Sequence, residues 1–91
     1  MRLAFGDCVL DIDRRELRRD GAIIHTRSKV FNILSYLAVN RDRVLSRDEL
    51  LAHVWPGLNI SDATLSSSIL SVRRAIGDDG SNPKFIKTLR G

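Results

Sequence analysis

The stretch that decides the fold is residues 61–77, SDATLSSSILSVRRAIG. Its large apolar side chains recur at spacings of four, three and four residues, which places them on one side of an α-helix. These side chains are Leu65, Ile69, Val72 and Ile76. The opposite side is small and hydroxyl-rich with a basic end, and it carries Ala63, Ser67, Leu70 and Arg74, flanked by Thr64 and Ser71. The pattern predicts a helix with one buried and one exposed side.

Both ends of this helix are marked in the sequence. Ser61 is a suitable N-cap, because its hydroxyl can accept a hydrogen bond from a backbone N–H of the first turn. Asp62 places a negative charge where the helix dipole favours it. Gly77 can take the left-handed conformation that ends many helices. The exposed side of such a helix can approach a DNA groove without a steric or desolvation penalty.

Another helix is predicted shortly before residues 61–77. Residues 46–49, SRDE, form a capping box with Ser46 as the N-cap and Glu49 three residues later. The buried side of this helix is predicted to consist of Leu50, Leu51, Val54 and Trp55, and Pro56-Gly57 ends it. Two consecutive helices with a short connection predict a helix-turn-helix over residues 46–77, in which the later helix is the recognition helix.

The rest of the chain predicts a small sheet, another helix and a wing. Residues 1–26 read as three or four short antiparallel strands, with a two-residue hairpin turn at Asp20-Gly21. Apolar periodicity predicts a helix over residues 28–40. Residues 84–91 are predicted to form a basic strand, which would be a partial wing. We therefore predict one α+β domain spanning residues 1–91, a winged helix-turn-helix with an N-terminal antiparallel β-sheet, three helices and a C-terminal wing.

Composition argues against several classes of protein. The formal net charge of +4 over 91 residues favours a polyanionic partner. Cys8 is the single cysteine, so no intramolecular disulfide is possible, and with only His25 and His53 we expect no metal site. No apolar run is long enough to span a membrane and no signal peptide opens the chain, which predicts a cytoplasmic domain. The residues offer no nucleophile with a nearby base and no glycine-rich phosphate loop, so we expect no enzymatic activity, small-molecule substrate or cofactor.

The densest basic cluster lies in the N-terminal strands, away from the predicted recognition helix. It consists of Arg14, Arg15, Arg18 and Arg19. We interpret these side chains as solvated strand residues that discourage pairing at sheet edges, in preference to a nucleic-acid surface.

Short motifs spread over almost the whole chain occur, in this order, in one known family. They are Phe5-Gly6-Asp7 to Leu10-Asp11, residues 16–21 (ELRRDG), Phe31 to Leu37, residues 43–51 (RVLSRDELL), Val54-Trp55, residues 61–65 (SDATL), residues 72–78 (VRRAIGD) and residues 86–91 (IKTLRG). The chain resembles the DNA-binding domain of OmpR/PhoB-type transcriptional regulators. The resemblance implies a four-stranded N-terminal sheet, three helices and a C-terminal hairpin wing. It also implies that the third helix enters the major groove and that a wing arginine reaches the minor groove.

The same resemblance implies which residues contact DNA. The candidates are Trp55, Ala63, Thr64, Ser67, Ser68, Ser71, Arg73, Arg74, Lys87, Thr88 and Arg90. Hydroxyl side chains of the third helix are expected in the groove, and its two arginines at a phosphate or base edge, with Arg74 better placed by its helical angle. Trp55 is expected to donate its indole N–H to a phosphate. Thr88 and Arg90 lie on the wing.

The resemblance also implies partners and a parent protein. Double-stranded DNA is the expected partner, with a head-to-tail homodimer on direct repeats and an RNA polymerase contact through the loop at residues 56–60. That loop is short for the family, and the second wing strand, usually Gly-Tyr-x-Phe, is absent. If Met1 is native, the DNA-binding domain leads its parent protein, as in membrane-tethered ToxR/CadC-like regulators. A receiver domain would precede it in a response regulator.

Several positions depart from the family and leave a second hypothesis open. The groove-facing positions of the third helix are mostly serine where the family often has arginine, and Leu70 stands among them. Arg27-Ser28 replaces the usual Thr-Pro at the start of the first helix. Serine bonds to several base edges and discriminates poorly between them. The alternative is a winged-helix protein-interaction module in which DNA binding is weak or lost.

Overall fold

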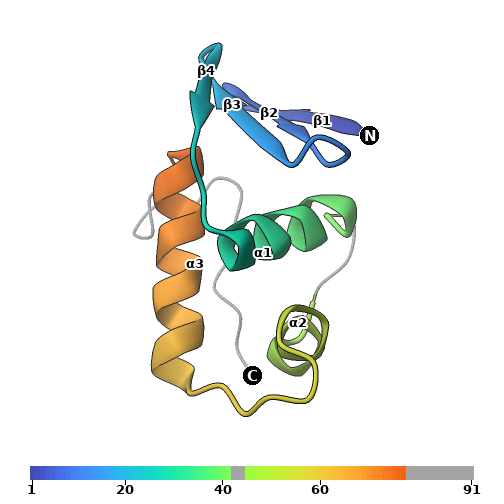
Figure 1. Ribbon diagram of the computed structural model, residues 1–91, viewed down its shortest axis with the longest axis vertical. Coiled ribbons are helices and arrows are strands. Elements are labelled where there is room, and N and C mark those ends of the chain that lie inside the picture. The colour runs from blue at the N-terminus through green and yellow to red at the C-terminus, as the bar shows by residue number, and fades with distance from the viewer. Residues whose placement is uncertain (42–44, 78–91) are drawn as a thin grey trace.

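A four-stranded antiparallel sheet leads into three helices (Figure 1). The computed structural model describes residues 1–41 and 45–77. Its elements are β1 (Arg2–Phe5), β2 (Cys8–Asp11), β3 (Glu16–Arg19), β4 (Ala22–Ile24), α1 (Ser28–Val39), α2 (Arg47–Val54) and α3 (Asp62–Ile76). The predicted partial wing at residues 84–91, with Lys87, Thr88 and Arg90, lies outside the described residues.

The sheet is a meander in which each strand pairs with its neighbour in sequence. Its register aligns one apolar row, because Leu10 lies opposite both Leu3 and Leu17, and Leu17 lies opposite Ile24. The middle two residues of the row, Leu10 and Leu17, are almost fully buried. The sheet therefore buries one face against the helical core.

The β3–β4 connection confirms the predicted hairpin turn. Asp20 and Gly21 have φ of 51° and 79°, which matches a two-residue turn with both residues left-handed.

The helices enclose one hydrophobic core beneath the sheet. In Figure 1, α1 lies between the sheet and α2, and α3 runs along one side of both layers. The predicted stripe of α3 is confirmed, with Leu65, Val72 and Ile76 buried and Ile69 half-buried against the core. The core residues of the other helices are Val30, Phe31, Ile33, Leu34, Leu50, Val54 and Trp55.

The predicted helix caps of the helix-turn-helix are confirmed. The hydroxyl of Ser46 accepts from the backbone N–H of Glu49 at 3.0 Å, and that of Ser61 accepts from the N–H of Thr64 at 3.2 Å. Gly77 ends α3 with a φ of 73°. The first helix differs, since its N-cap residue Arg27 makes no side-chain capping bond.

Three of the four clustered N-terminal arginines do more than remain in solvent, and one of them, Arg18, pairs with Glu16 at 3.2 Å. The Nη2 of Arg15 donates to Asn32 Oδ1 at 2.9 Å, and its guanidinium lies 4.6 Å from the centre of the Phe31 ring. Arg19 pairs with Asp7 at 3.5 Å. Arg15 thus ties the β2–β3 turn to α1, which the sequence interpretation of this cluster did not include.

Candidate nucleic-acid interface

The exposed side of α3 points away from α1 and α2 (Figure 1) and forms one continuous surface. We call this surface the outer face of α3; it consists of Ala63, Thr64, Ser67, Leu70, Ser71 and Arg74, all of which are exposed. Ser68 is half-buried at its margin. Six predicted DNA contacts therefore lie together on one helix: Ala63, Thr64, Ser67, Ser68, Ser71 and Arg74.

Local hydrogen bonds determine whether some hydroxyls of α3 can donate to a ligand or accept from it. Ser71 Oγ donates to the carbonyl oxygen of Ser67 at 3.1 Å, so its proton is engaged and its lone pairs remain as acceptors. Thr64 Oγ1 lies 3.0 Å from Ser61 Oγ, at the start of the helix. In the major groove, Ser71 in this state suits the amino donors of adenine or cytosine.

The start of α3 is fixed against the preceding helix by charge. Arg47, at the first position of α2, forms an ion pair with Asp62, at the first position of α3. The ion pair spans the turn of the helix-turn-helix. It engages the acidic group at the end of α3 that carries Thr64.

The two arginines of α3 differ in their exposure to solvent. Arg74 is exposed on the outer face, whereas only 6% of Arg73 is exposed. Arg73 lies four residues after Ile69, which itself lies four residues after Leu65, so it continues the inward row. This spacing could have identified Arg73 as buried. Its predicted contact with a phosphate or base edge stays a prediction.

Trp55 follows α2 and belongs to the hydrophobic core, with 7% of its surface exposed. Its backbone N–H donates to the carbonyl of Leu51 at 2.8 Å, which closes the last turn. Beyond it, Leu58 in the loop at residues 56–60 is 63% exposed. Lys29 of α1 donates to the carbonyl of Val54 at 2.9 Å, so a cation compensates the negative end of α2.

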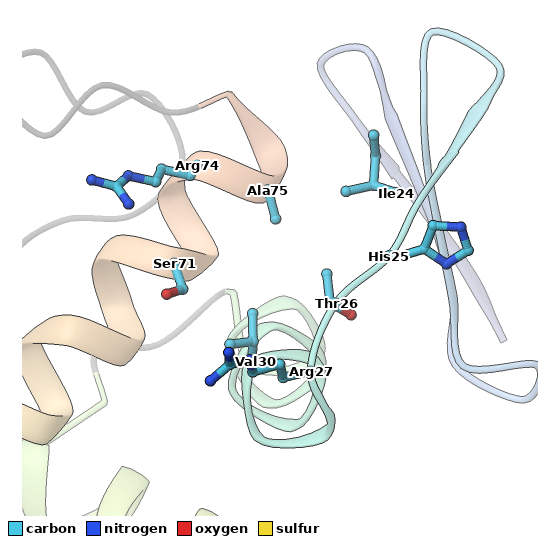
Figure 2. Close-up of a pocket in the computed structure, with 8 residues that line it drawn as sticks. All are labelled: Ile24, His25, Thr26, Arg27, Val30, Ser71, Arg74 and Ala75. Atoms are coloured by element: carbon cyan, nitrogen blue, oxygen red, sulfur yellow. The ribbon is translucent and has the colours of Figure 1, made fainter.

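A cleft of about 330 Å³ adjoins the outer face of α3 (Figure 2). One wall is the connection from β4 to the first turn of α1, and the other is the C-terminal half of α3. Its lining residues are Ile24, His25, Thr26, Arg27, Val30, Ser71, Arg74 and Ala75. The sequence prediction did not include Arg27 as a site residue. Its signal was the replacement of the usual family residues at the start of α1.

The described residues hold neither a metal cluster nor an activated thiol. In residues 1–41 and 45–77, no three His, Cys, Asp or Glu side chains lie close enough together to hold a metal ion. Burial, together with a hydrogen bond to Asp7, raises the pKa of Cys8 to about 11. A thiol of that pKa stays protonated at neutral pH and is a poor nucleophile or metal ligand. None of the helices in the described part of the chain is long and apolar enough to cross a membrane.

Comparison with known proteins assigns this arrangement to a family. Residues 15–91 match the family described as "Transcriptional regulatory protein, C terminal". The sensory transduction protein RegX3 of Mycolicibacterium smegmatis is 33% identical over 90 residues, which are 98% of this chain and 40% of that protein. The chain therefore spans less than half the length of this curated relative.

Solved structures agree with the sequence comparison. The response regulator DrrB of Thermotoga maritima, an OmpR/PhoB homologue, matches with a TM-score of 0.86 at 34% identity, over 96% of this chain and 40% of that one. The DNA-binding domain of Klebsiella pneumoniae RstA, solved in complex with the RstA box, matches with a TM-score of 0.82 at 25% identity, over 98% and 89% of the two chains. The predicted α+β winged-helix class is thereby confirmed. The chain belongs to the family of transcriptional regulatory protein C-terminal domains, the OmpR/PhoB-type winged-helix DNA-binding domains.

Proposed function

We propose that this domain binds double-stranded DNA sequence-specifically, with α3 in the major groove and the wing in the adjacent minor groove. The observation that carries the proposal is the outer face of α3, which is exposed, free of large side chains except Leu70, and edged by Arg74. The acidic residue of α3, Asp62, is engaged by Arg47. A B-DNA major groove admits a helix of this kind. The RstA domain, which shares the fold, was solved with its DNA box bound.

In this proposal, phosphate contacts position the domain and groove contacts select sequence. Arg74 binds a phosphate at the edge of the groove. Thr64, Ser67 and Ser71 contact base edges, with Ser71 accepting from adenine or cytosine amino groups. Leu70 packs against a thymine methyl group. In the wing, Lys87 and Thr88 bind the backbone and Arg90 senses the width of the minor groove.

A single domain that contacts bases through serines discriminates weakly between DNA sequences. Dimerisation therefore supplies the remaining specificity. We propose head-to-tail dimers on direct repeats, as part of a cytoplasmic bacterial regulator. The exposed loop at residues 56–60 is the proposed RNA polymerase contact. The input signal would come either from a receiver domain before this one, as in response regulators, or through a ToxR/CadC-like membrane tether after it.

Selection of bound fragments from a pool of genomic DNA, at near-physiological salt, tests this function. Enrichment of a short motif, especially as direct repeats, is the expected result and would identify the operator. Salt-sensitive binding without an enriched motif would contradict specific recognition by this domain alone. No binding at any salt concentration would reject the proposal.

The alternative function is a protein-interaction module, and Leu70 is the observation that favours it. This leucine is 47% exposed in the middle of the outer face of α3. A contact surface for another protein would tolerate Arg74→Ala. A DNA surface would lose affinity, and the slope of log affinity against log salt would shrink by about 0.9 for one lost phosphate contact. An unchanged slope, measured beside the wild-type chain, would favour the module.

A further inference from the structure

The cleft beside α3 is lined by two arginines from opposite walls and by no acidic residue. Arg27 comes from the N-cap position of α1, and Arg74 comes from the last turn of α3. In Figure 2 the Arg27 side chain extends from the start of α1 toward α3, while the Arg74 guanidinium projects to the outer side of that helix. Two cations thus border one cleft although they are 47 residues apart in sequence, from position 27 to position 74.

Neither arginine is neutralised by the protein around it. Arg2, Arg18, Arg19 and Arg47 each pair with an acidic side chain. Within residues 1–41 and 45–77, no hydrogen bond or ion pair engages the side chain of Arg27 or of Arg74. Two exposed guanidinium groups without a protein partner keep their full hydrogen-bonding capacity for an anion.

The backbone at the start of α1 adds to this positive character. The Arg27 side chain does not cap the helix, and the first turn contains no acidic residue. The first N–H groups of a helix lack intrahelical partners and carry the positive end of its dipole. This chain has Lys29 where many helices place an acid, and that lysine is turned toward α2. The helix start therefore favours an anion alongside the two arginines.

We infer that Arg27 binds a phosphate of the DNA backbone at this cleft, beside the phosphate that Arg74 binds at the outer side of α3, and we call this pair of contacts the clamp. The inference rests on the proposed function and adds Arg27, a residue of α1, to the interface. Ser71 and Arg74 belong both to the cleft and to the outer face of α3, so a duplex on that face brings its flanking backbone to the cleft. A guanidinium presents a planar fork of donors that matches two phosphate oxygens.

The clamp would add a phosphate contact to a helix that has few cations of its own. The outer face of α3 has serine at positions 67 and 71, with Ser68 at its margin, and Arg74 is its one exposed cation among the described residues. Phosphate contacts fix the register of a protein on the duplex. A second phosphate ligand from α1 therefore sets the depth and angle of α3 where its own side chains hold the backbone weakly.

Salt titration of DNA binding by the whole 91-residue chain tests the clamp, using one mixed-sequence duplex. Arg27→Ala should reduce the slope of log affinity against log salt by about 0.9, the value for one lost phosphate contact. Arg27→Lys keeps the charge and should restore most of the slope. Arg14→Ala is the matched control, because Arg14 is exposed on the β2–β3 turn outside the cleft and its loss changes net charge equally.

The outcomes separate this inference from the function on which it rests. If the wild-type chain binds DNA and Arg27→Ala keeps its slope, the clamp is wrong while DNA binding stands. An equal loss in Arg14→Ala would also overturn the clamp, since it would trace the effect to net charge. Absence of DNA binding by the wild-type chain would reject both. Thermal unfolding of each variant, expected to be unchanged because neither arginine caps a helix, excludes misfolding as the cause.

Discussion

The two sides of α3 show how one helix divides stability from recognition. The inner side is apolar and closed, and Val72 and Ile76 are at most 2% exposed. The outer face is polar and open, and the hydroxyl of Ser71 bonds within the helix. Burial of apolar surface stabilises a fold, whereas exposed serines contribute little to it. Changes on the inner side should therefore alter unfolding, and changes on the outer face should alter binding alone.

Ile76→Ala gives the largest expected effect. Removing a buried isoleucine side chain leaves a cavity under the sheet and should lower the free energy of unfolding by about 2–5 kcal/mol. Leu70→Ala, on the outer face of the same helix, is the control and should cost well under about 1 kcal/mol. Urea unfolding measures both. Equal losses of unfolding free energy in the two variants would contradict the difference between the inner side and the outer face of α3.

Alkaline pH tests the inner side at the end of α3, where Cys8 Sγ lies 3.7 Å from the carbonyl oxygen of Ile76. The pKa of Cys8 is raised to about 11 in the folded chain, above the ordinary thiol value of 9.0. The unfolded chain therefore loses the thiol proton first, so this contribution to stability is full below pH 9.0 and declines toward pH 11. The decline should be at most about 1.4 kcal/mol per pH unit and absent in Cys8→Ala. Parallel slopes for the two chains would contradict the buried thiol.

Gly77→Ala tests how tightly the sheet closes over the end of α3. The φ of 73° is left-handed, and an added Cβ would lie 2.7 Å from the guanidinium carbon of Arg19. Left-handed strain alone costs about 1–2 kcal/mol. Gly57→Ala is the matched control, because its φ is 76° with nothing within 4 Å of the added Cβ. The melting temperature of Gly77→Ala should be equal to or lower than that of Gly57→Ala. A higher melting temperature for Gly77→Ala would show that Arg19 does not pack against the end of α3.

Ser61→Ala removes the cap at the start of α3 and should cost about 1 kcal/mol of unfolding free energy. Arg27→Ala changes an N-cap residue whose side chain makes no capping bond, so its cost should be near zero. Calorimetry of the two variants compares a working cap with an unused one. A destabilised Arg27→Ala variant would show that the α1 start depends on this side chain.

Ser71→Ala gives the smallest effect on stability and sharpens the comparison most. Its exposed hydroxyl bonds only to the Ser67 carbonyl within the described residues, so unfolding should shift by less than about 0.5 kcal/mol. Affinity for a selected operator should fall while affinity for mixed-sequence DNA stays the same. Loss of both affinities to the same extent would assign Ser71 to the backbone instead of a base.

Local signals in the sequence predicted most of the fold. The serine caps, the left-handed Gly77 and the Asp20-Gly21 turn each follow from residues close in sequence, and all are confirmed. The apolar stripe of α3 follows from its spacing. Such features depend on residues that are close together in the sequence, so a single sequence is enough to predict them.

Features made by packing between distant segments could not be predicted in the same way. Arg15 bonds to α1 because the β2–β3 turn folds back onto that helix. The cleft exists only where the β4–α1 connection passes α3. The contacts of the candidate DNA residues stay predictions, since they depend on a partner outside the chain.

The closures at the two ends of α3 have a mechanical consequence. The Arg47–Asp62 ion pair holds the start of the helix, while Cys8 and Arg19 of the sheet lie against its last turn. Contacts at both ends of a helix oppose its tilting relative to the rest of the domain. A duplex bends and changes its groove width at a cost that depends on its sequence. If α3 enters a major groove as proposed, the nucleic acid would adapt more than the helix does, and flexible base-pair steps would become part of what α3 selects.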